Sequence, residues 1–134
     1  MSDAELGLAV KRLQVKQHRA ATEALRPLDV TLVQWDALRH LHAHPGASQH
    51  DLAVLTFQTD QAFGTLAARL EARDLIRRTT GSGRAIRLEL TAEGERVFAE
   101  GRTVTERLVR ESFGVLEPGE RIALGSMLER LLAR

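Results

Sequence analysis

Six arginines lie between residues 69 and 87 of this chain, against two acidic residues, Glu71 and Asp74. Guanidinium groups suit phosphate recognition, because each offers a planar set of donors and a permanent charge. The whole chain carries a net charge of only +1, so the remaining residues are net acidic. This uneven distribution predicts a surface that binds a polyanion, with a plain solvated face as the alternative. The six are Arg69, Arg73, Arg77, Arg78, Arg84 and Arg87.

Uncharged polar side chains precede these arginines, around a glycine at position 64. They are Gln58, Thr59, Gln61 and Thr65. Glutamine can pair with the edge of adenine, and threonine can contact a thymine methyl group or a phosphate. We predict that these four side chains read base pairs, with helix capping and surface filling as the alternative for Thr59 and Gln61. No arginine lies among them, so strong readout of guanine is not expected.

The elements that must position these side chains follow from periodicity and caps. Apolar residues recur at helical spacing from about residue 4 to 25, from 31 to 43 and from 91 to 113, and again after Pro118. Two shorter helices are predicted after residues 48 and 59. The residue types at the helix starts can cap free backbone amides or, for proline, fit the first turn. These residues are Thr31, Ser48, Thr59, Thr91 and Pro118.

Between residues 75 and 90 the pattern changes to that of a β-hairpin. Apolar side chains alternate with Arg87 and Glu89 in its second half, and the turn reads Gly81-Ser82-Gly83-Arg84. The predicted fold is therefore mainly α with a small β-hairpin, in the order ααααββαα, with a short extra strand near Ala47 as a further expectation. Two helices followed by an arginine-tipped hairpin form the plan of a winged helix-turn-helix. In that plan one helix enters a DNA major groove and the wing meets the neighbouring backbone or minor groove.

On this plan the DNA-binding surface has three parts. Ser48 and Gln49 meet backbone phosphates at a helix N-terminus, and the helix after Thr59 reads bases. The arginines that follow contact phosphates, and Arg84 probes the minor groove, with a solvated turn residue as its alternative. The predicted DNA-binding residues are Ser48, Gln49, Gln58, Thr59, Gln61, Thr65, Arg69, Arg73, Arg78, Ser82 and Arg84.

Composition excludes several other classes of protein. The 134 residues suit one domain, and the absence of cysteine removes disulfides and thiolate metal sites. Four phenylalanines, one tryptophan and no tyrosine argue against base-stacking surfaces for single strands or RNA. There is no glycine-rich phosphate loop and no Ser-His-Asp set in a recognisable context, so we expect neither an enzyme nor a cofactor. His40 and His44 share a helix face without a fixed carboxylate partner, so no metal site is predicted.

The chain lacks the marks of a membrane or secreted protein. Met1-Ser2-Asp3-Ala4-Glu5 is acidic where a secretory signal needs basic residues and an apolar run, and no apolar stretch is long enough to span a bilayer. We therefore expect a cytoplasmic location and no membrane partner.

Four segments, in this order and spacing, resemble the MarR family of bacterial transcription regulators over essentially the whole chain. They are Thr31-Leu-Val-Gln-Trp-Asp-Ala-Leu38, His44-Pro-Gly-Ala-Ser-Gln-His-Asp-Leu-Ala53, Leu70-Glu-Ala-Arg-Asp-Leu-Ile76 and Leu90-Thr-Ala-Glu-Gly94.

Two positions depart from the family pattern. Ser82 stands where the wing usually carries aspartate, which weakens the expected attachment of the wing to Arg69. Asp74 stands where a helix-ending glycine is common, and aspartate tolerates that left-handed geometry.

The resemblance implies a homodimer that binds a palindromic operator in double-stranded DNA, with repression as the usual outcome. Apolar residues on both terminal helices agree, because one small lobe cannot easily cover them. Packing of these helices on each other within one chain is the alternative. The residues are Leu6, Leu13, Leu116, Leu124, Leu128 and Leu131. We expect one domain over 1–134, with a DNA-binding lobe at about 31–91 and dimerisation helices at about 4–26 and 92–134.

The resemblance also implies a small anionic aromatic effector, bound between the dimerisation helices and the DNA-binding lobe. His18, Trp35 and His40 are the candidate pocket residues, and a plain core position is the alternative for Trp35. A second hypothesis for the whole protein is a winged-helix interaction module with degraded DNA binding. The low net charge, Asp60 in the reading helix and Ser82 in the wing favour it.

Overall fold

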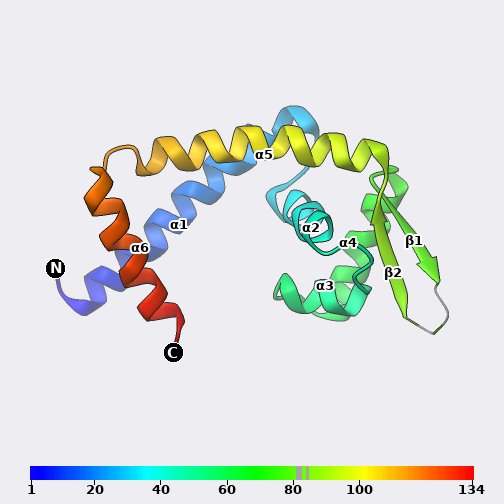
Figure 1. Ribbon diagram of the computed structural model, residues 1–134, viewed down its shortest axis with the longest axis horizontal. Helices are drawn as coiled ribbons and strands as arrows, with labels where there is room; N and C mark the ends of the chain where they lie inside the picture. Colours follow the sequence, from blue (N-terminus) through cyan, green and yellow to red (C-terminus); the bar gives the residue numbers. More distant parts are fainter. Residues whose placement is uncertain (81–82, 84) are drawn as a thin grey trace.

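The computed structural model describes residues 1–80, 83 and 85–134, and it has the predicted order of elements (Figure 1). A winged helix-turn-helix, mainly α with one hairpin, is confirmed as the fold. Its elements are α1 (Asp3–Leu25), a 3-10 turn η1 (Arg26–Leu28), α2 (Leu32–Ala43), α3 (Gln49–Leu55), α4 (Asp60–Ala72), β1 (Ile76–Thr80), β2 (Ile86–Leu90), α5 (Ala92–Phe113) and α6 (Pro118–Leu132).

Side-chain caps define four of the helix starts, as the sequence predicts. The hydroxyl groups of Thr31, Ser48, Thr59 and Thr91 each accept a hydrogen bond from a backbone amide three residues further on. At Thr31 and Ser48 the third helical residue bonds back to the cap, which completes a capping box. Local sequence chemistry therefore sets where the lobe helices begin.

Among the described residues, three other than glycine adopt left-handed backbone angles, each just after a helix or 3-10 turn. Asp74 ends α4 with φ 57°, at the position where the sequence predicts such a turn. Asp29 follows η1 with φ 56°. Phe57 lies between α3 and α4 with φ 57°, and its side chain is 99% exposed. The Phe57 turn was not predicted, because a bulky residue rarely adopts this conformation.

The wing is a two-stranded antiparallel hairpin in which Ile76 pairs with Leu90 and Thr80 pairs with Ile86. Leu88 is buried against the lobe, and Arg87 and Glu89 point outward. The extra strand predicted near Ala47 is reduced to one bridge between Ser48 and Arg87. The chain turns directly into α3 at Ser48, which leaves no length for a longer strand.

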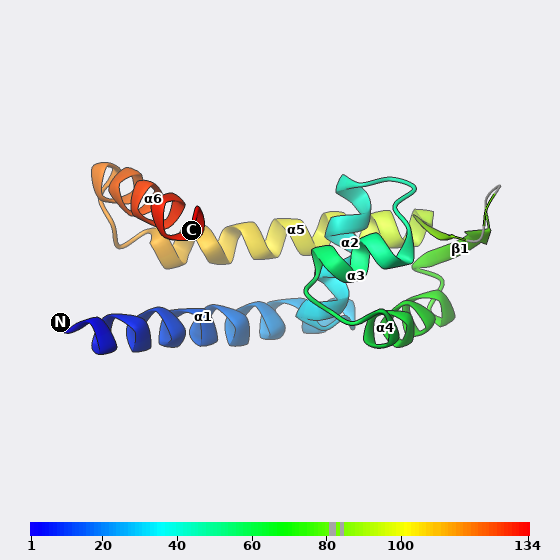
Figure 2. The same cartoon turned by 90° about the horizontal axis from the view of Figure 1, so that it is seen from below.

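The hydrophobic core lies in the lobe, where α2 and β2 pack against the first half of α5, and α3, α4 and β1 complete the same cluster. Phe63, Leu38 and Leu52 are among its fully buried side chains. Beyond the lobe, α1 and α5 run alongside each other as an arm, with both termini at the far end (Figure 2).

The apolar residues of the last helix were expected to exceed what one lobe can cover, and in the single chain α6 has no buried residue. Ile122 is 76% exposed and Leu131 is 68% exposed. On α1, Leu6 and Leu13 are exposed as well. The arm and α6 thus carry apolar surface that this chain alone does not cover.

Candidate nucleic-acid interface

The reading helix α4 presents one polar stripe to solvent. Gln61, Thr65 and Arg69 are exposed and lie four residues apart, so they share one face of the helix. Phe63, Ala67 and Leu70 on the opposite face are buried, which fixes the direction of the stripe. Thr65 also donates to the Gln61 carbonyl oxygen (3.2 Å). The structure thus brings together two of the predicted base-reading side chains and one predicted phosphate-binding arginine.

The other two predicted base readers help to hold the turn before α4. Thr59 caps the helix by accepting from the Ala62 amide (3.1 Å). Gln58 is half-buried and its Nε2 donates to the Thr56 hydroxyl (3.1 Å). The capping role considered for Thr59 is therefore present in the fold, and Gln58 has an intramolecular partner that the sequence did not indicate.

Ser48 and Gln49 lie at the start of α3, where Ser48 bridges to Arg87 of β2. Ser48 accepts from the Asp51 amide (3.0 Å) as the helix cap. Gln49 is half-buried, and a Cβ placed on Gly64 would lie 3.1 Å from its Nε2. The Gln49 side chain therefore packs against α4 and is not freely presented to solvent.

The predicted phosphate-binding arginines fall into two groups. Arg69 is exposed and forms no ion pair with the described residues. Arg73 caps the C-terminus of α4, and its guanidinium donates to the carbonyl oxygens of Asp29 and Leu28 beside η1. Arg78 also points toward the protein, and its guanidinium donates to a backbone carbonyl oxygen of α4. Sequence reasoning could identify these donors but not their acceptors.

Two predicted wing residues, Ser82 and Arg84, lie outside the described residues. At the other end of β1, Arg77 is exposed and pairs in the hairpin with Glu89, although it was not among the predicted contacts. Arg87 on β2 donates to the Gly46 carbonyl oxygen (3.0 Å) and so ties the wing to the turn before α3.

An ion pair at the helix-turn-helix was missed by sequence reasoning. His50 Nδ1 on α3 donates to the Asp60 carboxylate at the start of α4 (2.8 Å). This hydrogen bond, with the charges of Asp60 and Asp51, raises the pKa of His50 above its usual value near 6.5. Both side chains are about two-thirds exposed, so the pair lies at the surface of the lobe where α3 and α4 meet. The only indication of this ion pair in the sequence was the position of Asp60 in the first turn of a predicted helix.

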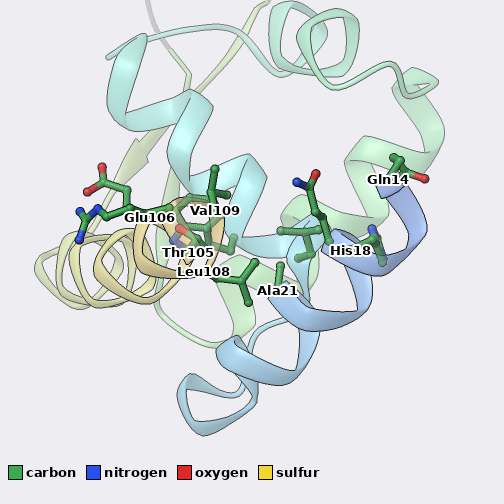
Figure 3. Close-up of a pocket in the computed structure, with 11 residues that line it drawn as sticks. Gln14, His18, Ala21, Thr105, Glu106, Leu108 and Val109 are labelled. Atoms are coloured by element: carbon green, nitrogen blue, oxygen red, sulfur yellow. The ribbon is translucent and has the colours of Figure 1, made fainter. Parts of the chain in front are cut away.

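A second feature is an open cavity of about 620 Å³ between α1, α2 and α5 (Figure 3). His18 and Trp35 both line it, as predicted for an effector pocket, together with Gln14, Glu106 and Arg110. Its lining is largely apolar apart from these polar side chains, which is typical of sites for small organic molecules.

Trp35 is anchored in the cavity wall, because its Nε1 donates to the Phe98 carbonyl oxygen (3.2 Å). A Cβ on Gly101 of α5 would overlap the indole, so this glycine allows the close approach of α5. His40 does not line the cavity. It lies 3.4 Å from the Asp36 carboxylate and stacks on the ring of His44.

The described residues contain no group of three histidine, aspartate or glutamate side chains that could hold a metal ion. Within the same residues, no helix is long and apolar enough to cross a membrane.

Comparison with known proteins places these features in a family. A model of the MarR family matches residues 28–85, from η1 to the hairpin. The HTH-type transcriptional repressor Rv2887 of Mycobacterium tuberculosis is 30% identical over 131 residues, which cover 96% of this chain and 94% of the relative. The chain belongs to the MarR family. The family membership predicted from the sequence is thereby confirmed, and MarR proteins are transcriptional regulators.

Further relatives within the MarR family agree in length and fold. The transcriptional regulator HosA of Escherichia coli is 28% identical over 119 residues, 87% of each chain. The transcriptional repressor CouR, bound to a 23-mer DNA duplex, is 30% identical with a TM-score of 0.86 over 96% of this chain and 92% of its own. Rv2887 in complex with salicylic acid is 29% identical with a TM-score of 0.75 over 94% and 95%.

Proposed function

We propose that this protein is a transcriptional repressor that binds a palindromic operator in double-stranded DNA as a homodimer. The observation that carries the proposal is the exposed stripe of Gln61, Thr65 and Arg69 on a helix that the lobe holds by its opposite face. Two relatives support it, since Rv2887 is a repressor and CouR is a repressor bound to a DNA duplex. A regulator of this kind acts where the chromosome is, which in a bacterium is the cytoplasm.

The decisive experiment is selection of genomic DNA fragments by the purified full chain, followed by affinity measurements on the selected sequence at several salt concentrations. A palindromic site, with affinity that falls steeply as salt increases, is the expected result. Binding without sequence preference and with little salt dependence would overturn the proposal. That outcome would favour the alternative of a protein-interaction module.

Substitutions on the stripe separate base reading from phosphate binding. Gln61→Ala should narrow the difference in affinity between the operator and a duplex altered at the bases that α4 reads, because the discriminating hydrogen bonds are lost. Arg69→Ala should instead weaken binding to both duplexes and reduce the salt slope by about 1. Fluorescence anisotropy with labelled duplexes measures both quantities.

Arg96→Ala is the matched control for the loss of an arginine. Arg96 lies on α5, outside the proposed reading surface, and its charge is paired with Glu93 and Glu100 of the same helix, so DNA affinity should stay unchanged. Unchanged selectivity in Gln61→Ala would remove this residue from the reading surface.

We further propose that the cavity between α1, α2 and α5 takes a small anionic aromatic effector that releases DNA. Its apolar walls suit an aromatic ring, and Arg110 and His18 supply the positive charge or donors for an anion. Rv2887, with salicylic acid bound, is a relative that binds such a molecule.

Trp35 makes this proposal directly measurable, because it is the one tryptophan of the chain and it lines the cavity. Salicylate should change the tryptophan emission and lower DNA affinity over the same concentration range. Arg110→Ala should shift both curves to higher salicylate concentration. DNA release without a change in emission would place the effector elsewhere.

A further inference from the structure

Arg78 belongs to the wing, but its side chain contacts the reading helix. Its Nη2 donates to the Gly64 carbonyl oxygen of α4 (2.9 Å). Its backbone amide donates to the Glu71 carboxylate (3.2 Å), and its Nε lies 3.9 Å from the same carboxylate. The guanidinium side chain is 28% exposed, so these contacts are partly shielded from water. One residue of β1 therefore holds α4 at two points.

The two points are far enough apart to fix the orientation of the helix. Gly64 and Glu71 are seven residues apart, which is two turns or roughly 10 Å of helix. A single contact would leave α4 free to rotate or slide against the wing, whereas two contacts on one side restrict both motions. The contact at Gly64 lies between Gln61 and Thr65 in the chain, within the segment that carries the exposed stripe.

The Gly64 position is also where α3 meets α4. The Gln49 side chain packs there, and its Oε1 is a buried atom without a hydrogen-bond partner among the described residues, as is Arg78 Nε. Side chains from α3 and β1 thus converge on one backbone unit of the reading helix. A change at this point is transmitted to the stripe directly, because Gly64 lies on the same helix, between Gln61 and Thr65.

We propose that Arg78 and Glu71 are positioning residues for DNA recognition, which hold the reading helix in register with the wing. This inference rests on the proposed function, since it assigns the means by which the same interface keeps its selectivity. It differs from a phosphate contact by Arg78, because the guanidinium is directed at protein acceptors on α4.

The two roles of Arg78 predict opposite effects of Glu71→Gln. If Arg78 bound phosphate, removing the carboxylate would free the guanidinium, remove a negative charge near DNA and raise affinity. If the pair positions α4, the same change should lower operator affinity by roughly five- to tenfold and leave the salt slope unchanged. The ratio of affinities for the operator and a base-altered duplex should also fall. If the substitution only destabilised the fold, a smaller fraction of the protein would be active. The affinities for both duplexes would then fall by the same factor, and their ratio would not change.

Arg78→Lys is the second variant, since it keeps the positive charge but replaces the planar guanidinium whose Nη2 donates to the Gly64 carbonyl oxygen and whose Nε lies 3.9 Å from the Glu71 carboxylate. Positioning predicts a loss of selectivity similar to that of Glu71→Gln, and the double variant should be little worse than either single one. Glu89→Gln is the matched control, because it removes an exposed carboxylate from the same hairpin. Its selectivity should equal that of the wild type.

Amide hydrogen exchange in the absence of DNA supplies a readout that does not depend on the proposed function. Glu71→Ala, which removes the side-chain acceptor altogether, should speed exchange at the Arg78 amide, whose acceptor is the Glu71 carboxylate. Affinity equal to or above wild type in Glu71→Gln would overturn the positioning role while leaving operator binding intact. Failure of the wild type to select an operator would instead overturn the proposed function.

Discussion

At the scale of single residues, the same chemical group has different roles according to what faces it. Arg69 extends to solvent on the reading helix, whereas Arg73 donates to carbonyl oxygens beside η1. In the sequence the two arginines look alike, since they are four residues apart near the end of the same helix, α4. The acceptors of Arg73 lie more than forty residues away in the chain, and no local pattern points to them. Residue type therefore predicts a donor, and tertiary structure determines its acceptor.

The pair of His50 and Asp60 should make DNA binding depend on pH. Because the pKa of His50 is raised, the stabilisation that the pair gives is fully present below the ordinary histidine pKa, and it is lost as pH increases through the raised value. The protonated His50 also offsets the negative charge of Asp60 next to the DNA phosphates. Operator affinity should therefore increase as pH falls from about 8 to about 6.

Affinity measurements across this pH range with His50→Gln provide the check on that prediction. The variant should show a flatter dependence, since the titrating group is gone. His44→Gln is the control, because this exposed histidine bonds within its own helix end and should keep the wild-type profile. An unaltered pH profile in His50→Gln would assign the effect to another group.

At the scale of elements, the parts of the fold set by local chemistry were predictable. The caps at Thr31, Ser48 and Thr91 follow from side chains that bond within three residues, and Asp74 was expected to end α4. The extra strand near Ala47 was predicted, but its reduction to a single bridge was not, because the length of a strand depends on where its neighbour runs. The same applies to the site, where the stripe on α4 follows from periodicity but the contacts of Arg78 do not.

The turn between α3 and α4 stores strain that a substitution can relieve. Phe57 has a left-handed backbone and an almost fully exposed side chain. In the single chain, the unfavourable backbone conformation is therefore not offset by burial of the ring. Phe57→Asn should raise the free energy of unfolding by about 0.5–1 kcal/mol, because asparagine tolerates this region of backbone angles. Chemical denaturation at fixed protein concentration measures the change.

Phe57→Ala is the matched control for that turn, since it removes the ring but keeps a side chain that disfavours the left-handed region. Its stability should remain close to that of the wild type. A clear loss of stability in both variants would mean that the ring is covered in the assembled protein.

At the scale of the whole molecule, the lobe and the arm differ in what stabilises them. The lobe has its own core, whereas α6 buries nothing within the chain and the far half of α1 exposes Leu6 and Leu13. A second copy that covers these surfaces would complete the fold, in agreement with the expected division into a DNA-binding lobe at about 31–91 and dimerisation helices. Dimerisation is thus expected to contribute much of the stability of the arm.

Leu131→Asp tests this division of the chain. A charge at an apolar contact between subunits should raise the dimer dissociation constant by at least about tenfold, because the carboxylate would be buried without a partner. Sedimentation or light scattering over a range of concentrations gives the constant. Val54→Asp, at an exposed apolar position on α3 in the lobe, should remain as dimeric as the wild type. An unchanged dissociation constant in Leu131→Asp would place the interface elsewhere.

The position of the cavity along α5 has a mechanical consequence. Thr105 lines the cavity and Thr91 marks the start of the helix beside the wing, so about 20 Å of rigid helix separates the two. A tilt of about 5° around Thr105 moves the Thr91 end by roughly 2 Å, and opposite tilts in two subunits change the separation of their lobes by roughly 4 Å. Successive major grooves on one side of DNA are about 34 Å apart, so such a change spoils simultaneous fit in both. In the dimer proposed above, α5 would act as a lever that turns a small displacement at the cavity into a mismatch with the pitch of the double helix.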